Sequence, residues 1–214
     1  PLLDGMQPAS SVTYLTDTLG DRAVWYIEQH ASESFFLCLA FNAVHTPMEA
    51  PEKYLARFPN ITDVRRRTYA AMMSAMDDAI GRTLAAVRDH KLEENTLVIF
   101  LNDNGGPTMP TTTINGSSNG PLRGSKRQTW EGGIRVALAM SWKGHLGAGR
   151  VDDRPIIQLD VLPTGEVRVR QRLVGQPADG AARYPSIVAE RLVAHRARRG
   201  TNHRAEDPEQ RRLA

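Results

Sequence analysis

The chain of 214 residues contains one cysteine, Cys38, so no disulfide can form within it, and the redox compartment stays open. Long apolar runs are also missing. The longest, residues 35–41, falls far short of the roughly 18 residues that a membrane-spanning helix needs, so we expect no membrane span. The chain starts at Pro1 without a basic and then apolar leader. We therefore expect any export signal to lie upstream in a longer parent protein, for which a periplasmic or secreted location stays open.

The last fifty residues, 165–214, lack Phe, Trp, Met, Cys and Lys. They hold eleven Arg against six acidic residues, a net charge of +5, whereas the whole chain carries +3, so residues 1–164 carry −2. A segment of this composition buries little apolar surface to offset the entropy cost of ordering it, so we expect an irregular, disordered tail. The positive charge belongs to this tail and says little about what residues 1–164 bind.

Three apolar segments of the first 164 residues have the length and composition of β-strands. Residues 35–41 and 96–101 are continuous apolar runs, which are typical of strands covered on both faces. A third strand is expected near residues 134–142. Within the first run we expect Cys38 to be a buried core residue, because apolar neighbours surround it in the sequence.

Two helices accompany these strands. One is expected from a cap at Thr16 or Asp17 to about His30, and a longer one from about Thr62 to about His90. We interpret the apolar stripe of the longer helix as core packing rather than as a methionine-rich binding groove. The stripe consists of Tyr69, Met72, Met73, Met76, Ile80, Leu84 and Val87. Covered strands that alternate with helices predict an α/β fold.

A polar segment, Asp103-Asn104-Gly105-Gly106, directly follows the second apolar run. A carboxylate and an amide oxygen side by side are hard ligands that suit Ca²⁺ or Mg²⁺, and the glycines permit a sharp turn. The same four residues also fit an Asn-Gly hairpin turn without any ligand. On local sequence alone both interpretations stay open.

Two further segments carry groups that can contact an anion. His45, after the first run and next to the rigid Pro47, can donate to an anionic oxygen, although it also fits an ordinary surface histidine. Arg123 and Lys126 stand beside a glycine in a loop that can close over an anion. Their spacing departs from that of a phosphate-binding P-loop, because the upstream glycines and the following helix are missing. Glu131, a little further on, can orient a neighbouring cation.

The order of these segments is more specific than any one of them. Over about residues 8–164, a His-Thr-Pro segment after a strand precedes a long helix, a strand that ends in Asp-Asn-Gly-Gly, and two glycine-containing segments. The matched segments are 45–47, 103–106, 119–126 and 130–135, flanked by 14–17 and 159–164. This arrangement resembles the sulfatase family of the alkaline-phosphatase-like superfamily. The resemblance implies an α/β sandwich with a mostly parallel or mixed sheet flanked by helices, present here as a partial catalytic domain over residues 1–164.

The resemblance also implies roles for individual residues. Asp103 and Asn104 would be two ligands of a single divalent cation, usually calcium, with magnesium as the alternative. His45 and Lys126 would contact the sulfate as catalytic and substrate-binding groups, lowering the cost of the negative charge that builds up on it and on the leaving oxygen. The implied reaction is hydrolysis of a sulfuric ester, arylsulfatase-like, on a small-molecule or glycan substrate. Arg123, Glu131 and Arg135 would support these groups.

The nucleophile of this family is a formylglycine made from Cys or Ser in a Cys/Ser-x-Pro-x-Arg motif, which lies in the N-terminal half of the domain together with the remaining metal ligands. This sequence contains no such motif. We therefore expect the chain to be the C-terminal part of a catalytic domain, inactive alone, because catalytic groups that act as a unit lose most of their effect when one is removed.

After residue 164 the family continues with an apolar helix, whereas here the apolar pattern stops and arginine replaces lysine. We hypothesise a reading-frame error in a GC-rich gene; translating the parent DNA in the other two frames should restore an apolar helix, and the idea fails if neither does.

Two other functions stay open. One is a phosphonate or phosphate ester hydrolase of the same superfamily. The other is a non-catalytic binding protein whose basic tail contacts nucleic acid; because the tail holds one aromatic residue, Tyr184, and no known motif, we expect no nucleic-acid partner. No oligomeric state follows from the sequence.

Overall fold

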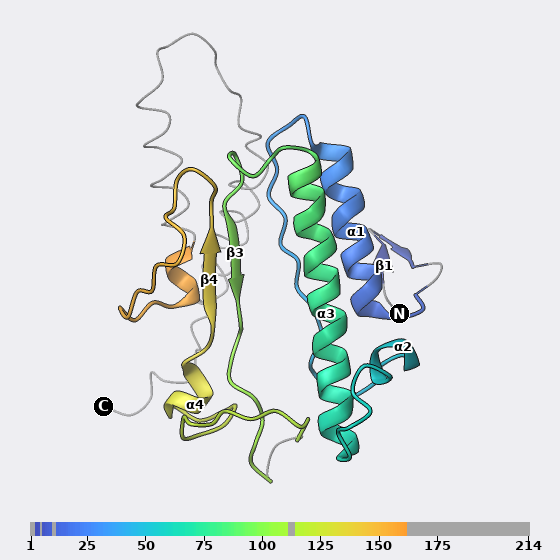
Figure 1. Ribbon diagram of the computed structural model, residues 1–214, viewed down its shortest axis with the longest axis vertical. Helices are drawn as coiled ribbons and strands as arrows, with labels where there is room; N and C mark the ends of the chain where they lie inside the picture. Colours follow the sequence, from blue (N-terminus) through green and yellow to red (C-terminus); the bar gives the residue numbers. More distant parts are fainter. Residues whose placement is uncertain (1–2, 5, 10–11, 111–113, 162–214) are drawn as a thin grey trace, which may run out of the picture. The chain divides into compact units, whose positions relative to one another are not determined.

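The computed structural model describes residues 3–4, 6–9, 12–110 and 114–161, so the predicted disordered tail at 165–214 and the domain boundary at 164 lie outside the described residues. Helices and strands succeed one another along the described chain, as Figure 1 shows. They are β1 (Leu3–Asp4), β2 (Gln7–Pro8), α1 (Leu15–His30), α2 (Glu52–Leu55), α3 (Val64–Asp89), β3 (Val98–Leu101), α4 (Glu131–Ile134), β4 (Leu138–Ser141) and the 3-10 turn Gln158–Asp160. Among these residues no helix is both long enough and apolar enough to cross a membrane.

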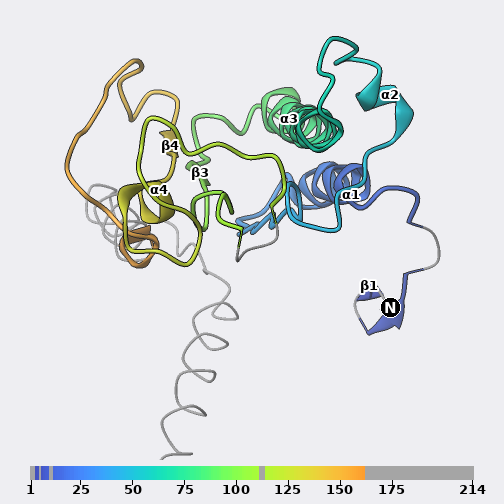
Figure 2. The same cartoon turned by 90° about the horizontal axis from the view of Figure 1, so that it is seen from below.

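The two long helices α1 and α3 lie side by side in both views of the ribbon (Figures 1 and 2). Gly20 of α1 and Ala79 of α3 meet so closely that a Cβ built at Gly20 would lie 2.7 Å from the Ala79 Cβ. Small residues at this crossing let the helix backbones approach. The buried residues of α3 are Ala71, Met72, Ala75, Ala79, Ala86 and Val87.

The long helix is therefore confirmed, and its buried face consists mainly of alanines. Met72 and Val87 of the predicted apolar stripe are buried, while Tyr69 and the other members of the stripe are half-buried. The helix starts where Asp63 caps it, since the Asp63 carboxylate accepts a hydrogen bond from the Arg66 backbone N–H at 2.7 Å.

The predicted strand at residues 35–41 is wrong: this segment forms no strand. Its side chains point alternately toward the helices and toward solvent, as they do in any extended chain. Phe35 and Leu37 pack against the buried cluster of Ile27, Ala86 and Val87, whereas Phe36 is 70% exposed. Cys38 is exposed as well, so its predicted burial is also wrong. The helices cover only one side of this segment.

The strands β3 and β4 pair antiparallel, from Val98 opposite Ser141 to Leu101 opposite Leu138. Both predicted strands thus exist in shortened form, and residues 131–134 form α4 in place of the start of the second. Both sheets within the described ranges are two-stranded and antiparallel, and no parallel pair occurs there. The prediction that β3 is covered on both faces is wrong, because Phe100 and Leu101 are exposed.

The predicted cap of α1 is wrong as well. The helix begins at Leu15, and Tyr14 precedes it without a capping side-chain hydrogen bond. Thr16 is buried inside the first turn. Asp17 faces the other helices, where partners distant in sequence bind its carboxylate.

Candidate functional site

The Asp103-Asn104-Gly105-Gly106 segment, hereafter the Asp-Asn turn, leaves the end of β3 and is held by backbone hydrogen bonds. The Gly105 N–H donates to the Gly133 carbonyl at 2.9 Å. A Cβ at Gly105 would lie 1.9 Å from the Gly132 carbonyl oxygen, so the two segments cross at a distance that only glycine permits. The Gln158 amide donates to the carbonyl of Asp103 at 3.3 Å. The segment is therefore no simple hairpin turn between adjacent strands.

The side chains of the Asp-Asn turn offer two oxygen donors. The exposed Asp103 carboxylate accepts the Asn104 backbone N–H at 2.9 Å through Oδ1. The Asn104 amide nitrogen donates to the Gly105 carbonyl at 2.9 Å, which leaves the amide oxygen to serve as an acceptor or ligand. This donor chemistry fits part of a calcium site, which takes six to eight oxygens. Throughout the described ranges no group of three or more His, Cys, Asp or Glu side chains is placed to hold a metal.

One side chain, Asn119, joins the Asp-Asn turn to the loop that carries Lys126. Its amide oxygen accepts the Gly106 N–H at 2.8 Å, while its amide nitrogen donates to the carbonyls of Gly106 at 2.8 Å and Gly124 at 3.0 Å. The Lys126 backbone N–H donates to the same Gly106 carbonyl at 3.1 Å. The backbones of the two predicted site segments therefore lie in contact.

A second polar side chain, Ser125, strengthens this junction. It is fully buried, and its hydroxyl accepts the Thr108 N–H at 2.8 Å and lies 3.4 Å from the Gly106 carbonyl. The sequence did not single out Asn119 or Ser125, because side chains that bind backbone atoms leave no periodic pattern. Their one signal is their position within the matched segment 119–126.

His45 lies on a loop that a different residue fastens to the same region. Asn115, itself buried, donates to the Val44 carbonyl at 2.8 Å, and its amide oxygen accepts the Ser117 N–H at 3.1 Å. The exposed His45 ring places Nδ1 2.8 Å from the Thr46 carbonyl, so Nδ1 carries a hydrogen and Nε2 remains available.

A cavity of about 260 Å³ lies over the Asp-Asn turn, with Asn104, Ser117, Asn119 and Arg135 in its lining. Asp103, His45 and Lys126 are not part of that lining. No hydrogen bond among the described residues joins the side chains of the four predicted site residues to one another. The structure therefore brings their segments together through backbone contacts and the side chains of Asn115 and Asn119, and it does not assemble their functional groups in one cavity.

A family model for sulfatases matches residues 4–165. The chain belongs to the sulfatase family. It is 40% identical over 124 residues to arylsulfatase J of Mus musculus, a match that covers 58% of this chain and 20% of the relative. It is 35% identical over 153 residues to steryl-sulfatase of the same species, covering 70% of this chain and 24% of the relative.

Solved structures share the fold of the chain. The structure of Ps i-CgsB in complex with k-i-k-neocarrahexaose aligns with a TM-score of 0.71 at 33% identity and covers 86% of this chain and 40% of that one. A sulfatase structure from Bacteroides fragilis, yidJ, aligns with a TM-score of 0.61 at 21% identity, covering 76% of this chain and 39% of that one; at this identity it shows the fold alone. The predicted α/β fold of the alkaline-phosphatase-like type is confirmed. The chain spans between 20% and 40% of the length of each of these four proteins.

Around the site of this sulfatase chain, Arg123 and Arg135 have structural partners. The Arg123 guanidinium lies 4.1 Å from the centroid of the Trp130 ring, and the Arg123 carbonyl accepts the Gly132 N–H at 2.8 Å. Glu131 lies 3.4 Å from Arg135, in agreement with the prediction that it orients a neighbouring cation. Both side chains are well exposed, so this ion pair contributes little to stability.

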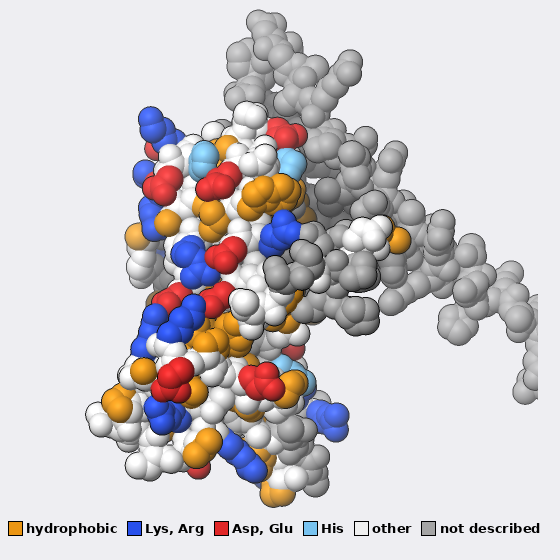
Figure 3. Space-filling model, turned by 90° about the vertical axis from the view of Figure 1, so that its right-hand side faces the viewer, with side chains coloured by type: hydrophobic (Ala, Val, Ile, Leu, Met, Phe, Trp, Pro, Cys, Tyr) orange, Lys and Arg blue, Asp and Glu red, His pale blue; other side chains and the backbone are white. Residues whose placement is uncertain are grey.

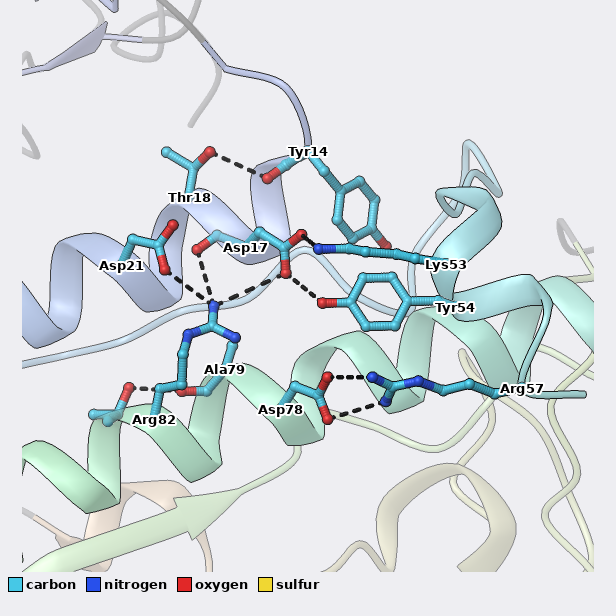
Figure 4. A network of polar contacts seen from close by, with 11 residues as sticks. Tyr14, Asp17, Thr18, Asp21, Lys53, Tyr54, Arg57, Asp78, Ala79 and Arg82 are labelled. Carbon is cyan, nitrogen blue, oxygen red and sulfur yellow. Dashed lines mark hydrogen bonds and ion pairs between the residues drawn. The ribbon is translucent and has the colours of Figure 1, made fainter.

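A network of charged and polar side chains joins the helices of the sulfatase chain (Figure 4). Asp17 of α1 accepts the Tyr54 hydroxyl at 2.6 Å and the Lys53 ammonium at 2.8 Å, both from α2. Arg82 of α3 donates to the Asp17 carbonyl at 3.4 Å and lies 3.1 Å from Asp21. Burial raises the pKa of Asp17, but the two side-chain hydrogen bonds and the charges of Lys53 and Arg82 outweigh it and hold the pKa below its ordinary value.

A second ion pair lies beside this network. Arg57 donates through both terminal nitrogens to Asp78, at 2.8 and 3.0 Å, and this bidentate contact lowers the pKa of the Asp78 carboxyl. Figure 3 shows basic and acidic side chains interspersed on this side of the molecule. Perturbed carboxyls often mark active sites, yet here the Asp17 partners join α1 to α2 and α3, and Arg57 joins the turn after α2 to α3. The network therefore supports the fold.

Proposed function

We propose that the chain belongs to a sulfuric ester hydrolase that uses one divalent cation, and that residues 103–126 supply half of its site. Membership of the sulfatase family supports the reaction class. The observation that carries the proposal for this chain is the junction at Gly106, whose carbonyl accepts from Asn119 and from the Lys126 backbone. The junction supports the proposal because it holds the backbone of the Asp-Asn turn against the loop that carries the Lys126 ammonium.

In this proposal Asp103 and Asn104 hold the cation through the carboxylate and the amide oxygen. Calcium is the expected metal, with magnesium as the alternative, since both prefer oxygen ligands. When bound, the cation supplies positive charge that stabilises anionic oxygens of the reacting group.

In the same proposal His45 and Lys126 bind the sulfate group. The Lys126 ammonium contacts sulfate oxygens as a point charge. With hydrogen on both ring nitrogens, His45 would donate Nδ1–H to the Thr46 carbonyl, which fixes the ring, and Nε2–H to the ester oxygen. Both groups lower the energy of negative charge on the sulfate and on the leaving oxygen.

The substrate class is a sulfate ester, either a small molecule or a glycan. The names of the relatives cover both kinds, because they include arylsulfatase J, steryl-sulfatase and N-acetylgalactosamine-6-sulfatase. The carrahexaose bound in the Ps i-CgsB complex is a glycan ligand of that protein. These names support the class and do not choose a substrate for this chain.

Two titrations test the proposal. Calcium added to the isotopically labelled chain should shift the backbone amide signals of residues 103–106, and Asp103→Asn should abolish that shift. p-Nitrophenyl sulfate should shift the signals of residues 123–126, and Lys126→Ala should abolish it. Shifts confined to other residues would contradict the assignment, and tighter binding of phenyl phosphonate than of the sulfate would favour the phosphonate or phosphate ester alternative.

We expect the purified chain to bind calcium weakly and not to hydrolyse p-nitrophenyl sulfate. Two metal ligands are far fewer than the six to eight that calcium takes, and the sequence holds no Cys/Ser-x-Pro-x-Arg motif. Release of p-nitrophenol, with and without calcium, measures this. Turnover that disappears in both Lys126→Ala and Asp103→Asn would show that the chain forms a complete site.

A further inference from the structure

The Asn119 side chain hydrogen-bonds directly to both the Asp-Asn turn and the loop before Lys126. Three contacts of 2.8, 2.8 and 3.0 Å use one acceptor and two donor positions of its amide. Two reach Gly106, which ends the Asp-Asn turn, and one reaches Gly124, two residues before Lys126. An amide held at three points in this way has a single orientation.

We propose that Asn119 is a positioning residue that couples cation binding at Asp103 and Asn104 to sulfate binding at Lys126. The inference rests on the proposed function, since it concerns how the two half-sites of that function communicate. Asn119 contacts neither ligand in this proposal. It acts by making the Asp-Asn turn and the Lys126 loop move as one body.

The surrounding packing leaves the turn little freedom to move independently. A Cβ at Gly106 would lie 2.2 Å from the Ser117 hydroxyl, and one at Gly124 would lie 2.5 Å from the Trp130 Cβ, so close neighbours confine both segments. A ligand that draws Asp103 and Asn104 toward itself therefore pulls on Gly106, and the Asn119 amide transmits this displacement to Gly124. Contiguous hydrogen bonds of this kind are the physical basis of coupling between nearby sites.

Coupling between two sites is reciprocal, so each ligand changes the affinity for the other by the same factor. We expect saturating calcium to raise the affinity of the wild-type chain for p-nitrophenyl sulfate by about fivefold or more, which is the lower end of typical couplings. In Asn119→Ala the ratio should fall close to one, while each ligand still binds alone. A residue that served only overall stability would lower both affinities and leave their ratio unchanged.

The test titrates the labelled full chain with p-nitrophenyl sulfate, with and without calcium, in four proteins. These are the wild type, Asn119→Ala, Asn119→Asp and the control Ser118→Ala. Asn119→Asp keeps the acceptor for the Gly106 N–H but loses both N–H donors. Ser118 is adjacent and accepts only the Gly120 N–H, at 3.3 Å, without bridging the segments. Thermal unfolding of each protein shows that it is folded; if Asn119→Ala is not, Asn119→Asp carries the test.

The amide exchange rate of Gly106 gives a second readout that needs no ligand. It should rise by about tenfold or more in Asn119→Ala, which removes its hydrogen-bond acceptor, and stay unchanged in Ser118→Ala. An unchanged calcium–sulfate ratio in the Asn119 variants, an equal loss in Ser118→Ala, or unchanged Gly106 exchange would overturn the inference. If the wild type binds neither ligand, the proposed function fails; if it binds both and the ratio survives Asn119→Ala, the inference alone fails.

Discussion

Removing the Asp17 carboxylate should reveal how much the network at the helices stabilises the chain. Asp17→Ala leaves the hydroxyl of Tyr54, a residue only 2% exposed, without its acceptor, and an unsatisfied buried group costs about 1–3 kcal/mol. Lys53 is 61% exposed, so its ion pair adds at most about 1 kcal/mol. We therefore expect a loss of about 2–3 kcal/mol in the free energy of unfolding.

Asp17→Asn separates the hydrogen bond from the charge. The asparagine oxygen still accepts the Tyr54 hydroxyl, so only the charge pairing with Lys53 and Arg82 is lost, at a cost of about 1 kcal/mol. Urea unfolding followed by far-UV circular dichroism measures both variants. The exposed Asp21, which pairs with Arg82, supplies the control: Asp21→Asn should change stability by less than about 0.5 kcal/mol.

The pH dependence of the same experiment has a definite sign. Because the folded-state pKa of Asp17 lies below its ordinary value of 3.8, its stabilisation is complete above the unfolded-state pKa and is lost as the pH falls through the folded-state pKa. The gap between wild type and Asp17→Asn should therefore close as the pH falls from about 7 to about 2. Asp78 also has a lowered pKa, but it is present in both proteins, so its contribution to the pH dependence cancels in the difference between them. A gap that is constant or grows at low pH, or equal losses in Asp17→Ala and Asp17→Asn, would refute this reasoning.

Two more predictions follow from packing and exposure. Gly20→Ala should destabilise the chain by about 1–2 kcal/mol, because the added methyl group would lie 2.7 Å from the Ala79 Cβ. Its matched control, Gly81→Ala, has open space around the new Cβ and should stabilise the chain by about 0.5–1 kcal/mol; thermal or urea unfolding measures both, and equal effects would contradict the close crossing of α1 and α3. Cys38 should react with a thiol reagent in the native state at a rate close to that of the unfolded chain, because it is exposed, whereas labelling only after unfolding would show that the apolar run is covered.

The helices were predictable because their signals are local. Apolar spacing located α1 and α3 to within about two residues, and the Asp63 cap stands where α3 begins. The segment 35–41 was not predictable, since an apolar run does not show whether neighbours cover one of its faces or both. Asp17 was assigned to a cap because its partners Lys53 and Arg82 lie 36 and 65 positions away, beyond any local pattern.

The candidate site was likewise predictable only in part from the sequence. The order of motifs pointed to His45, Asp103, Asn104 and Lys126, whose roles stay predictions. It did not find Asn119, because the two loops this residue joins meet only in the folded chain. The cavity over the Asp-Asn turn likewise depends on side chains from α3 and from the segment after α4, which no single motif contains.

The crossing of Gly105 with Gly132 and Gly133 and the amide of Asn119 hold two parts of the Asp-Asn turn by different means. Main-chain atoms hold Gly105, so its position tolerates changes in nearby side chains, whereas Gly106 is held by the Asn119 amide. The exposed Thr108 side chain can therefore be varied without displacing Gly105. A crossing of this kind suits a family whose members carry names as different as arylsulfatase and steryl-sulfatase, and it recommends Thr108 as a position to vary in the laboratory.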